Sequence, residues 1–577
     1  MCGFVGLFDI RRKSDALRGQ VLKMSKQIRH RGPDWSGVYC GERAILSHER
    51  LSIVDPQSGG QPLFSCDGKQ VLAVNGEIYN HQEIRAELAG EYDFRTGSDC
   101  EVILPLYRKL GVGLLEKISG IFAFALYDIE KDEYLIARDP VGVIPLYIGW
   151  DSDEQFYVAS EQKALEGVCS TIRPFLPGHY WSSREGKMVR WYKRDWFEYD
   201  AVKDNGADIP TLRKALESAV KRQLMSDVPY GVLLSGGLDS SILSAVAARA
   251  YAARNETLHT WSVDYRENQR YFVKNSFQPT DDRDFAALMT DFLGTHHHRV
   301  VLDPEAVCAA LRPAAEARGL PGMADVDSSL LLFCAAVKQG GTTVCLSGEC
   351  ADELFGGYPW YHREEILFED TFPWSRSVSL RLGLLREGVV KNGAEFVREH
   401  YLSTCRRAPR LPSDSPKDAR MREMFVLNLD WFMATLLDRK DRMSMYSGLE
   451  VRVPFCDHRI VEYAYNMPWA FKALDGREKG IVRRAFADEL PEAIISRRKS
   501  PYPKTFHPVY ARLCAEGARR ILADRNSFAA ALFDREAVER LILDPDSLPE
   551  PWFGQLMMGP QLLAYFIQLE LWLRRYQ

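Results

Sequence analysis

The sequence lacks features that mark several large classes of protein. It has no apolar run long enough to span a bilayer, and its first apolar residues precede the basic ones, the reverse of a secretory signal. Charge of one sign is not in excess, since 74 basic and 79 acidic residues give a net charge of −5. We therefore expect a cytoplasmic protein that has neither a membrane nor nucleic acid as a partner.

Closely spaced cysteine pairs are also missing. The 12 cysteines are scattered from Cys2 to Cys514 without a Cys-x-x-Cys pair, which excludes the usual zinc ribbon and the dense disulfide framework of small secreted domains. Most are interpreted as buried free thiols, with Cys2 as the exception. The histidine run 296–298 would point to alternate faces of a strand, so this run is not expected to hold a metal.

The length of the chain predicts at least two domains, because 577 residues exceed what one hydrophobic core usually supports. Short apolar strands with turn signals dominate up to about residue 192, and a polar stretch follows at residues 198–210. We expect one domain over residues 1–200 and another over residues 208–577. The strands expected in the first domain are residues 4–8, 71–74 (ending at Asn75-Gly76), 121–127 and 134–137.

The second domain begins with alternating strands and helices. An apolar strand over residues 231–234 is followed by a Gly-Gly loop and an Ala-rich helix over about 240–253. This alternation predicts a parallel, doubly wound sheet, which usually binds nucleotides at the carboxyl ends of its strands. We expect this α/β core over about 208–360 and a mainly helical part over about 361–577. Other expected elements are a helix at 212–224, strands at 260–263, 298–302 and 343–346, and a helix at 285–292.

Cys2 is the first candidate for catalysis. If Met1 is removed, Cys2 carries both a thiol and an α-amine, and an amine with a pKa of about 8 accepts the thiol proton at neutral pH. Position alone is equally compatible with an incidental cysteine. The region also contains the segments 29–34 (Arg-His-Arg-Gly-Pro-Asp), 49–53 (Glu-Arg-Leu-Ser-Ile), 75–80 (Asn-Gly-Glu-Ile-Tyr-Asn) and 97–99 (Gly-Ser-Asp). With these segments, the domain closely resembles the class II glutamine amidotransferases.

This resemblance implies an N-terminal nucleophile αββα sandwich that hydrolyses glutamine through a thioester on Cys2. Asn75 and Gly76 would hold the oxyanion, and losing one such donor typically lowers the rate on the order of 10²–10³. Arg50 would bind the α-carboxylate of glutamine, and Asp99 its α-ammonium group. The implied glutamine-binding set is Arg50, Ile53, Val54, Asn75, Gly76, Glu77 and Asp99.

Each of these residues has an ordinary alternative. Asn75-Gly76 is a common hairpin turn, Arg50 could form a surface ion pair, and Asp99 could cap a helix. The combination of all of them behind an N-terminal cysteine favours the catalytic interpretation.

A second motif, Ser235-Gly236-Gly237-Leu238-Asp239-Ser240, lies between an expected strand and an expected helix. Backbone N–H groups and the helix N-terminus would face one spot there, which suits an anion. No Gly-Lys-Ser/Thr follows, so the segment is not a Walker A loop. It resembles the PP-loop of ATP pyrophosphatases, which cleave ATP to an adenylate and pyrophosphate.

A cluster of carboxylates follows another strand, in Ser347-Gly348-Glu349-Cys350-Ala351-Asp352-Glu353. Asp239 and Asp352 are hard oxygen ligands suited to Mg²⁺. The synthetase half resembles the asparagine synthetases, also through residues 438–445 and 448–455, and this implies catalytic roles for Glu349 at the acyl-adenylate and for Lys479 beside the phosphates. The implied ATP-binding residues are Leu234, Ser235, Gly236, Gly237, Asp239, Ser240, Val263, Ser347 and Gly348.

The two resemblances together imply a glutamine-hydrolysing asparagine synthetase with glutamine, aspartate and ATP as substrates and Mg²⁺ as cofactor. Ammonia released at Cys2 would attack an aspartyl-AMP intermediate, giving asparagine, glutamate, AMP and pyrophosphate; a homodimer is compatible with this interpretation. The alternative is a related amidotransferase that modifies another carboxylate in a specialised pathway. It is favoured by Cys350, where the family often has glycine, and by the long segments 266–279 and 364–420.

Overall fold

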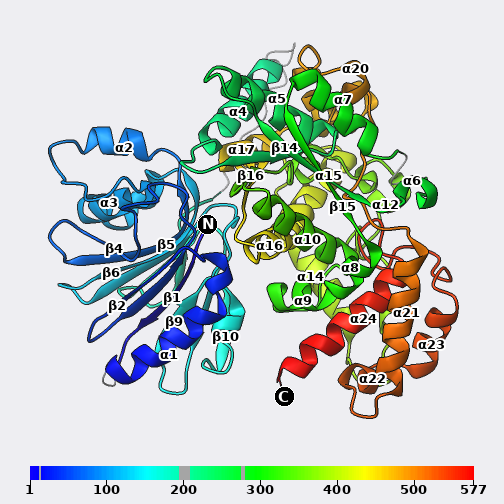
Figure 1. The fold of residues 1–577 in the computed structure, drawn as a ribbon, viewed down its shortest axis with the longest axis horizontal. Coiled ribbons are helices and arrows are strands. Elements are labelled where there is room, and N and C mark those ends of the chain that lie inside the picture. The colour runs from blue at the N-terminus through cyan, green and yellow to red at the C-terminus, as the bar shows by residue number, and fades with distance from the viewer. Residues whose placement is uncertain (12–13, 194–207, 275–279, 577) are drawn as a thin grey trace.

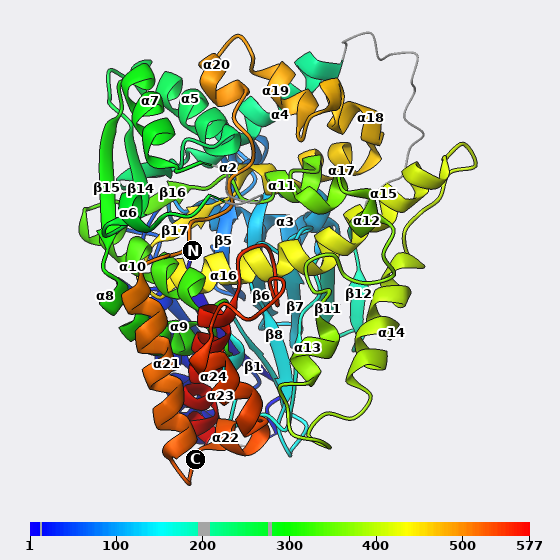
Figure 2. The same cartoon turned by 90° about the vertical axis from the view of Figure 1, so that its right-hand side faces the viewer.

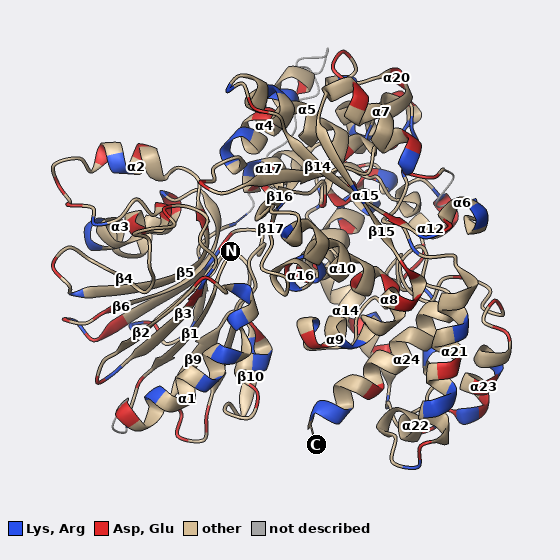
Figure 3. Ribbon diagram, in the orientation of Figure 1, with Lys and Arg blue, Asp and Glu red and all other residues tan. Residues whose placement is uncertain are grey.

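The computed structural model describes residues 1–11, 14–193, 208–274 and 280–576. Two antiparallel sheets form the N-terminal part, and one parallel sheet with many helices forms the C-terminal part (Figure 1). Most of the polar stretch expected between the domains falls on residues 194–207, which lie outside the described residues. Basic and acidic residues are interspersed over both parts, in keeping with the balanced composition (Figure 3).

Each antiparallel sheet of the N-terminal part has six strands. The first sheet runs in the order β10 (Thr171–Pro174), β8 (Tyr147–Trp150), β9 (Phe156–Ala159), β1 (Gly3–Phe8), β3 (Ile45–Arg50) and β2 (Trp35–Cys40). The second runs in the order β12 (Met188–Arg190), β11 (His179–Ser182), β7 (Glu133–Arg138), β6 (Gly120–Asp128), β5 (Gln70–Ile78) and β4 (Leu63–Phe64).

Alternating side chains within the strands explain how the sheets are covered. In β1, Phe4 and Phe8 belong to the core between the sheets, whereas Val5 and Leu7 pack with the outer helix α1 (Ser14–Gln27). Helices α2 (His81–Glu87) and α3 (Ile103–Leu110) pack against the outer face of the second sheet. The αββα sandwich expected from the sequence is confirmed (Figure 1).

Strand β5 is longer than expected. Asn75 and Gly76 were expected to end it, but its pairing with β6 continues as far as Ile78 opposite Gly120. The pair forms no turn there, because β6 supplies partners beyond it. Gly76 has a φ of 145°, and a Cβ at this position would collide with the carbonyl oxygen of Ile121, so the close approach of the strands requires glycine.

The C-terminal part is a doubly wound sheet, as expected. Apolar residues of α5 pack with β13 on one face, whereas Trp261 of β14 packs with Leu330 of α10 on the other. The five parallel strands run in the order β15 (His296–Leu302), β14 (His259–Tyr265), β13 (Tyr230–Leu233), β16 (Val344–Leu346) and β17 (Glu450–Arg452). The main covering helices are α4 (Asp208–Gln223), α5 (Leu238–Ala252), α7 (Arg283–Leu293), α8 (Pro304–Ala309), α9 (Leu311–Arg318), α10 (Asp325–Gln339) and α16 (Met433–Met445).

The segment 364–420, which belongs to the part expected to be mainly helical, folds beside an aromatic cluster. Trp374 packs against Phe432 with ring centroids 4.9 Å apart, and Tyr401 of α14 lies in the same cluster. The helices of this segment are α12 (Glu364–Leu367), α13 (Val378–Leu382), α14 (Gly393–Cys405) and the start of α15 (Pro416–Leu427).

A further helical layer closes the C-terminal end and shares one apolar core with residues of β14, β15, α8 and α9. Among the helices of the described ranges, each is too short or too polar to cross a membrane. The layer consists of α21 (Pro508–Ala523), α22 (Phe528–Leu532), α23 (Arg535–Leu543) and α24 (Gly559–Leu573).

Candidate active sites

Cys2 lies directly before β1 and beside the middle of β5. Its backbone N–H donates to Oδ1 of Asn75 at 2.7 Å, and both residues are buried. Within the described part of the chain, Nδ2 of Asn75 has no hydrogen-bond partner. A buried, unpaired amide donor is costly unless a ligand completes it, so this Nδ2 group is available to an oxygen bound next to Cys2.

The Cys2 thiol needs a base. Burial raises the pKa of Cys2, and its Sγ lies 3.7 Å from the carbonyl oxygen of Leu51. At neutral pH the thiol therefore keeps its proton. Met1 is still attached and fully buried, with its amino group in contact with Glu450 of β17.

Arg50 is placed differently from a free carboxylate-binding fork. Its Nη2 group donates to the carbonyl oxygens of Val54 and Asp55 at 2.9 and 2.7 Å, and Nη1 reaches that of Pro56 at 3.3 Å. The guanidinium group thus holds the loop after β3 in place. Ile53 is buried in the same loop.

Asp99 is buried close to Glu77, another residue of the expected glutamine-binding set. Its Oδ2 accepts the backbone N–H of Ile78 at 2.6 Å. Burial and the neighbouring charge of Glu77 raise the pKa of Asp99 to about 7. Two buried carboxyl groups of this kind favour a ligand that brings a positive charge.

Buried charges connect this site to the C-terminal part. Glu161 lies 2.8 Å from Arg31, 2.7 Å from Lys163 and 3.0 Å from Arg442 of α16. Although burial opposes its ionisation, Lys163 and Arg442 hold the pKa of Glu161 well below its usual range. The contact between the two parts therefore contains buried, paired charges, whose interaction depends strongly on geometry.

The second candidate site is a cavity of about 510 Å³ at the carboxyl ends of β13, β14 and β16. Gly236 does not line it; its φ of 68° and the backbone of Phe285, with which a Cβ would collide, explain the glycine. Glu349, Asp352 and Lys479 do line the cavity. The other expected ATP-binding residues also line it: Leu234, Ser235, Gly237, Asp239, Ser240, Val263, Ser347 and Gly348.

Lys479 joins the two carboxylates of the cavity. Its Nζ lies 2.5 Å from Asp239 and 2.6 Å from Asp352, and Lys499 lies 2.5 Å from the other oxygen of Asp352. Burial opposes ionisation of Asp352, but the two ammonium groups lower the pKa of Asp352 to about 2. Burial raises the pKa of Asp239. These two carboxylates and two ammonium groups form a compact cluster of alternating charge that lines the cavity beside the PP-loop.

Sequence reasoning gave no site role to several residues of this cavity. Arg439 of α16 lies 3.0 Å from Glu349, and Lys499 pairs with Asp352. Arg439 belongs to the basic segment 438–445, which was noted without a role, and Lys499 ends the run Arg497-Arg498-Lys499. The run of three basic residues at 497–499 was the sequence feature that could have indicated a contact with phosphate or carboxylate groups.

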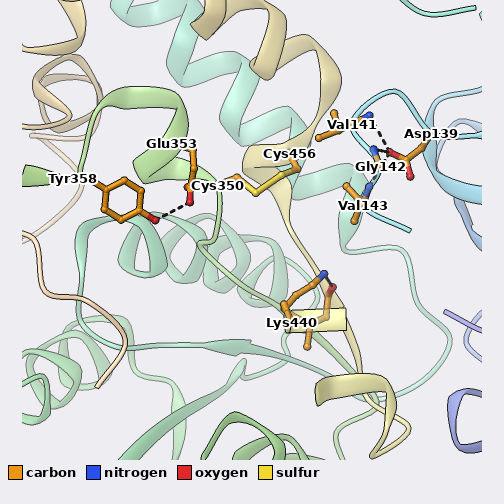
Figure 4. The surroundings of a disulfide bond; sticks show 10 residues. Asp139, Val141, Gly142, Val143, Cys350, Glu353, Tyr358, Lys440 and Cys456 are labelled. Carbon is orange, nitrogen blue, oxygen red and sulfur yellow. Dashed lines mark hydrogen bonds between the residues drawn. A yellow bond between two sulfur atoms is a disulfide. The ribbon is translucent and has the colours of Figure 1, made fainter. Parts of the chain in front are cut away.

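Cys350 forms a disulfide with Cys456, across 106 residues of sequence. Its φ of 78° is a left-handed conformation that glycine adopts easily and cysteine rarely does. Cys350 lines the cavity, whereas Cys456 borders the turn at Asp139 in the N-terminal part. The disulfide thus lies between the cavity residues Glu353 and Tyr358 and that turn (Figure 4).

Comparison with known proteins agrees with this two-site arrangement. Residues 1–184 match the glutamine amidotransferase domain family, and residues 211–574 match the asparagine synthase family. The glutamine-hydrolysing asparagine synthetase 3 of Bacillus subtilis is 39% identical over 100% of this chain and 99% of its own length. Asparagine synthetase B of Escherichia coli is 40% identical over 87% of this chain and 82% of its own length.

A fungal relative extends the comparison. The probable asparagine synthetase of Schizosaccharomyces pombe is 36% identical over 87% of this chain and 84% of its own length. The match to the asparagine synthase family alone covers more than half of the chain. The chain therefore belongs to the asparagine synthase family and carries a glutamine amidotransferase domain at its N-terminal end.

Proposed function

We propose that this chain is a glutamine-hydrolysing asparagine synthetase, which converts aspartate, glutamine and ATP to asparagine, glutamate, AMP and pyrophosphate. The observation that carries the proposal is the presence of both centres in one chain, the Cys2–Asn75 pair and the cavity around Lys479. The full-length similarity to relatives of that name supports it. The proposal includes the domain limits 1–200 and 208–577, a cytoplasmic location and a homodimeric assembly.

Glutamine hydrolysis would begin once Met1 is removed. The freed α-amine of Cys2 takes the thiol proton, and the thiolate attacks the side-chain amide of glutamine. The buried, unpaired Nδ2 group of Asn75 and the N–H of Gly76 stabilise the charge that develops on the amide oxygen. The amine returns the proton to the leaving ammonia, and water then hydrolyses the thioester.

Glutamine would be oriented by charge. Asp99 in its ionised form pairs with the α-ammonium group, and the neighbouring Glu77 adds to the negative potential there. Arg50 is committed to the carbonyl oxygens of Val54 and Asp55, so we propose that it binds the α-carboxylate only together with a movement of that loop. Ile53, in the same loop, would cover the bound glutamine.

At the second site, the carboxylate of aspartate must be activated, because attack on an anionic carboxylate is unfavourable. The PP-loop residues Ser235, Gly237 and Ser240 line the cavity where the phosphates of ATP would bind. Lys479 would neutralise charge on the phosphates as aspartate displaces pyrophosphate. Glu349, held by Arg439, lies beside the same space and would face the acyl-adenylate.

The cavity also fits Mg²⁺. The buried Oδ1 atom of Asp239 has no hydrogen-bond partner in the described chain, and Asp352 supplies a second carboxylate across Lys479. Oxygen atoms of this kind are the ligands that Mg²⁺ prefers. We propose Asp239 and Asp352 as its protein ligands; when bound, it would neutralise charge on the phosphates of ATP. Lys479 contacts both carboxylates and Lys499 contacts Asp352, which holds the two acidic side chains in place.

Exchange of labelled pyrophosphate into ATP tests this function. The purified chain should catalyse exchange when aspartate is present and not with glutamate, β-alanine or other carboxylates. Turnover with glutamine should produce AMP, and light scattering would show the mass of a dimer. Exchange driven by another carboxylate, or formation of ADP in place of AMP, would contradict the proposal.

A further inference from the structure

Three histidine side chains gather at the amino ends of the edge strand β15 and its neighbour β14 in the parallel sheet. His259 begins β14, and His296 and His298 lie at the start of β15, where His259 is the register partner of His296. One nitrogen from each ring lies within 4.8 Å of the others. We propose that these three residues form a binding site for a transition-metal dication, with zinc as the preferred ion.

The sheet itself brings the three rings together. His296 and His298 are two residues apart and so share one face of β15, while the parallel register places His259 beside them. His297 points to the opposite face, where its ring nitrogens contact the hydroxyls of Thr260 and Ser262 at 3.0 and 2.9 Å. Because side chains alternate between the two faces of a strand, only His297 of the run faces away from the site. His259 of the neighbouring strand provides the third imidazole.

The distances are close to those of a metal centre. Nδ1 of His259 and Nε2 of His298 are 2.9 Å apart. Zinc binds histidine nitrogen at about 2.0–2.1 Å in tetrahedral geometry, which separates two such nitrogens by roughly 3.4 Å. His259 and His296 are exposed, so their rings are free to swing through the small distance that remains.

Neighbouring residues hold one ligand in place. The ring of Trp261 stacks on His298 with centroids 4.0 Å apart, and Trp261 Nε1 donates to the hydroxyl of Thr342 at 3.2 Å. One ring is thus held by its neighbours, and two exposed rings complete the set. This arrangement favours capture of an ion from solvent, because little of the protein must be reorganised.

The ligand chemistry separates this site from the one proposed for Mg²⁺. Three neutral imidazoles with open positions for water suit Zn²⁺, Cu²⁺ or Ni²⁺, whereas Mg²⁺ prefers carboxylate and phosphate oxygens. The histidines also lie at the amino ends of the strands, and the ATP cavity lies at the carboxyl ends. An ion bound here would tie β15, the edge strand, to β14 (Figure 2).

Zinc titration of the untagged, full-length chain tests the site. Calorimetry is run without nucleotide and with excess Mg²⁺, which fills oxygen sites and does not compete for imidazole. We expect one zinc per chain. His259→Gln and His296→Gln should each weaken zinc binding at least about tenfold. Even the loss of a residue that only hydrogen-bonds a metal ligand typically lowers metal affinity about 10–100-fold. His297→Gln is the matched control and should bind zinc like the unaltered chain.

Cobalt identifies the donor atoms. Co²⁺ at three imidazoles gives weak visible bands, whereas thiolate donors, for example the exposed Cys40, add an intense sulfur-to-metal band. The proposal is overturned if the unaltered chain fails to bind zinc at micromolar concentration. It is equally overturned if the thiolate band accompanies binding, or if the His259→Gln/His296→Gln double variant binds as tightly as the unaltered chain.

Melting curves separate binding from misfolding. Zinc should raise the melting temperature of the unaltered chain and of His297→Gln, because an ion that binds only the folded state stabilises it. The double variant should melt at the same temperature with and without zinc. Without metal, it should also match the unaltered chain, because both substituted side chains are exposed. A zinc-induced rise in the double variant would overturn the assignment.

Discussion

Arg31 and Asp441 form a two-pronged ion pair across the contact between the two parts of the chain. Nη1 and Nη2 of Arg31 donate to the two carboxylate oxygens of Asp441 at 2.7 and 2.9 Å, and both side chains are buried. Nε of the same arginine donates to the carbonyl oxygen of Cys2 at 2.8 Å. One side chain therefore connects the proposed nucleophile with α16, whose Arg439 and Lys440 line the ATP cavity.

Removal of Arg31 should uncouple the two sites. Arg31→Met leaves Asp441 charged and buried, which typically lowers the free energy of unfolding by about 3–5 kcal/mol. Glutamine-dependent synthesis should also fall more than ammonia-dependent synthesis, because Cys2 loses its contact. Urea unfolding and the ratio of the two activities measure these effects.

The neighbouring Arg29 is the matched control. Its side chain is 55% exposed and reaches Glu49 at 3.6 Å, so Arg29→Met should change stability by less than about 1 kcal/mol. If both variants unfold at the same urea concentration and keep the same activity ratio, the coupling role of Arg31 is wrong.

Cys2→Ala should abolish glutamine-dependent synthesis and leave synthesis from free ammonia within about twofold, since the second site does not need the thiol. Glutamate release and asparagine formation, each followed by chromatography, measure the two outcomes. Mass spectrometry of the unaltered chain should show a mass without Met1. Substantial glutamine use by Cys2→Ala, or complete retention of Met1 in active protein, would argue against the proposed nucleophile.

Local sequence patterns predicted much of the fold and cavity. Strand-end motifs such as the one at Ser235 are read from a few adjacent residues, and the cavity indeed brings them together. Long-range partners carry no such signal: Arg31 and Asp441 are 410 residues apart, and the disulfide of Cys350 spans 106. The length of β5 was likewise missed, because pairing with β6 overrides the turn preference of Asn75-Gly76.

Glutamine binding should weaken as the pH falls through about 7. Burial and Glu77 raise the pKa of Asp99 to about 7, and only its ionised form attracts the α-ammonium group of glutamine. Below this pH the KM for glutamine should rise by about tenfold per pH unit. Glutaminase assays from about pH 5.5 to about pH 8.5, roughly 1.5 units on either side of this pKa, measure the change in KM.

Asp99→Asn provides the control for this pH dependence. The variant should have a high KM that changes little with pH, because it has no ionisable group to pair with the substrate. A KM that still rises in the variant as the pH falls would assign the effect to another group, such as the Cys2 amine.

Lys479 should be needed for ATP chemistry and not for glutamine hydrolysis. Without its ammonium group, Asp239 and Asp352 repel each other and the phosphates, so Lys479→Met should lower pyrophosphate exchange on the order of 10²–10³. Glutaminase activity should be unaffected. Arg484, which is 54% exposed and pairs only with Asp475 among its described ion partners, is a suitable control through Arg484→Met. Equal exchange rates in the two variants would contradict the role of Lys479.

The Cys350–Cys456 disulfide should hold the cavity loop in shape. Closing a loop of about 100 residues stabilises a fold by up to about 4.7 kcal/mol, with 2–4 kcal/mol typical, so Cys456→Ala should lower the unfolding midpoint measurably. Because Cys350 stands between Glu349 and Asp352, the KM for ATP should also rise.

A dithiol reductant distinguishes loss of the bond from loss of the side chain. It should reproduce both effects in the unaltered chain and add nothing in Cys456→Ala, whereas Cys308→Ala, which removes a free thiol, should respond to reductant like the unaltered chain. Both effects of the reductant should come from this one bond. The bond holds Cys350 in a left-handed backbone conformation, which is strained for cysteine. If alkylation under non-reducing conditions labels both Cys350 and Cys456, the bond does not restrain the loop and neither effect should occur.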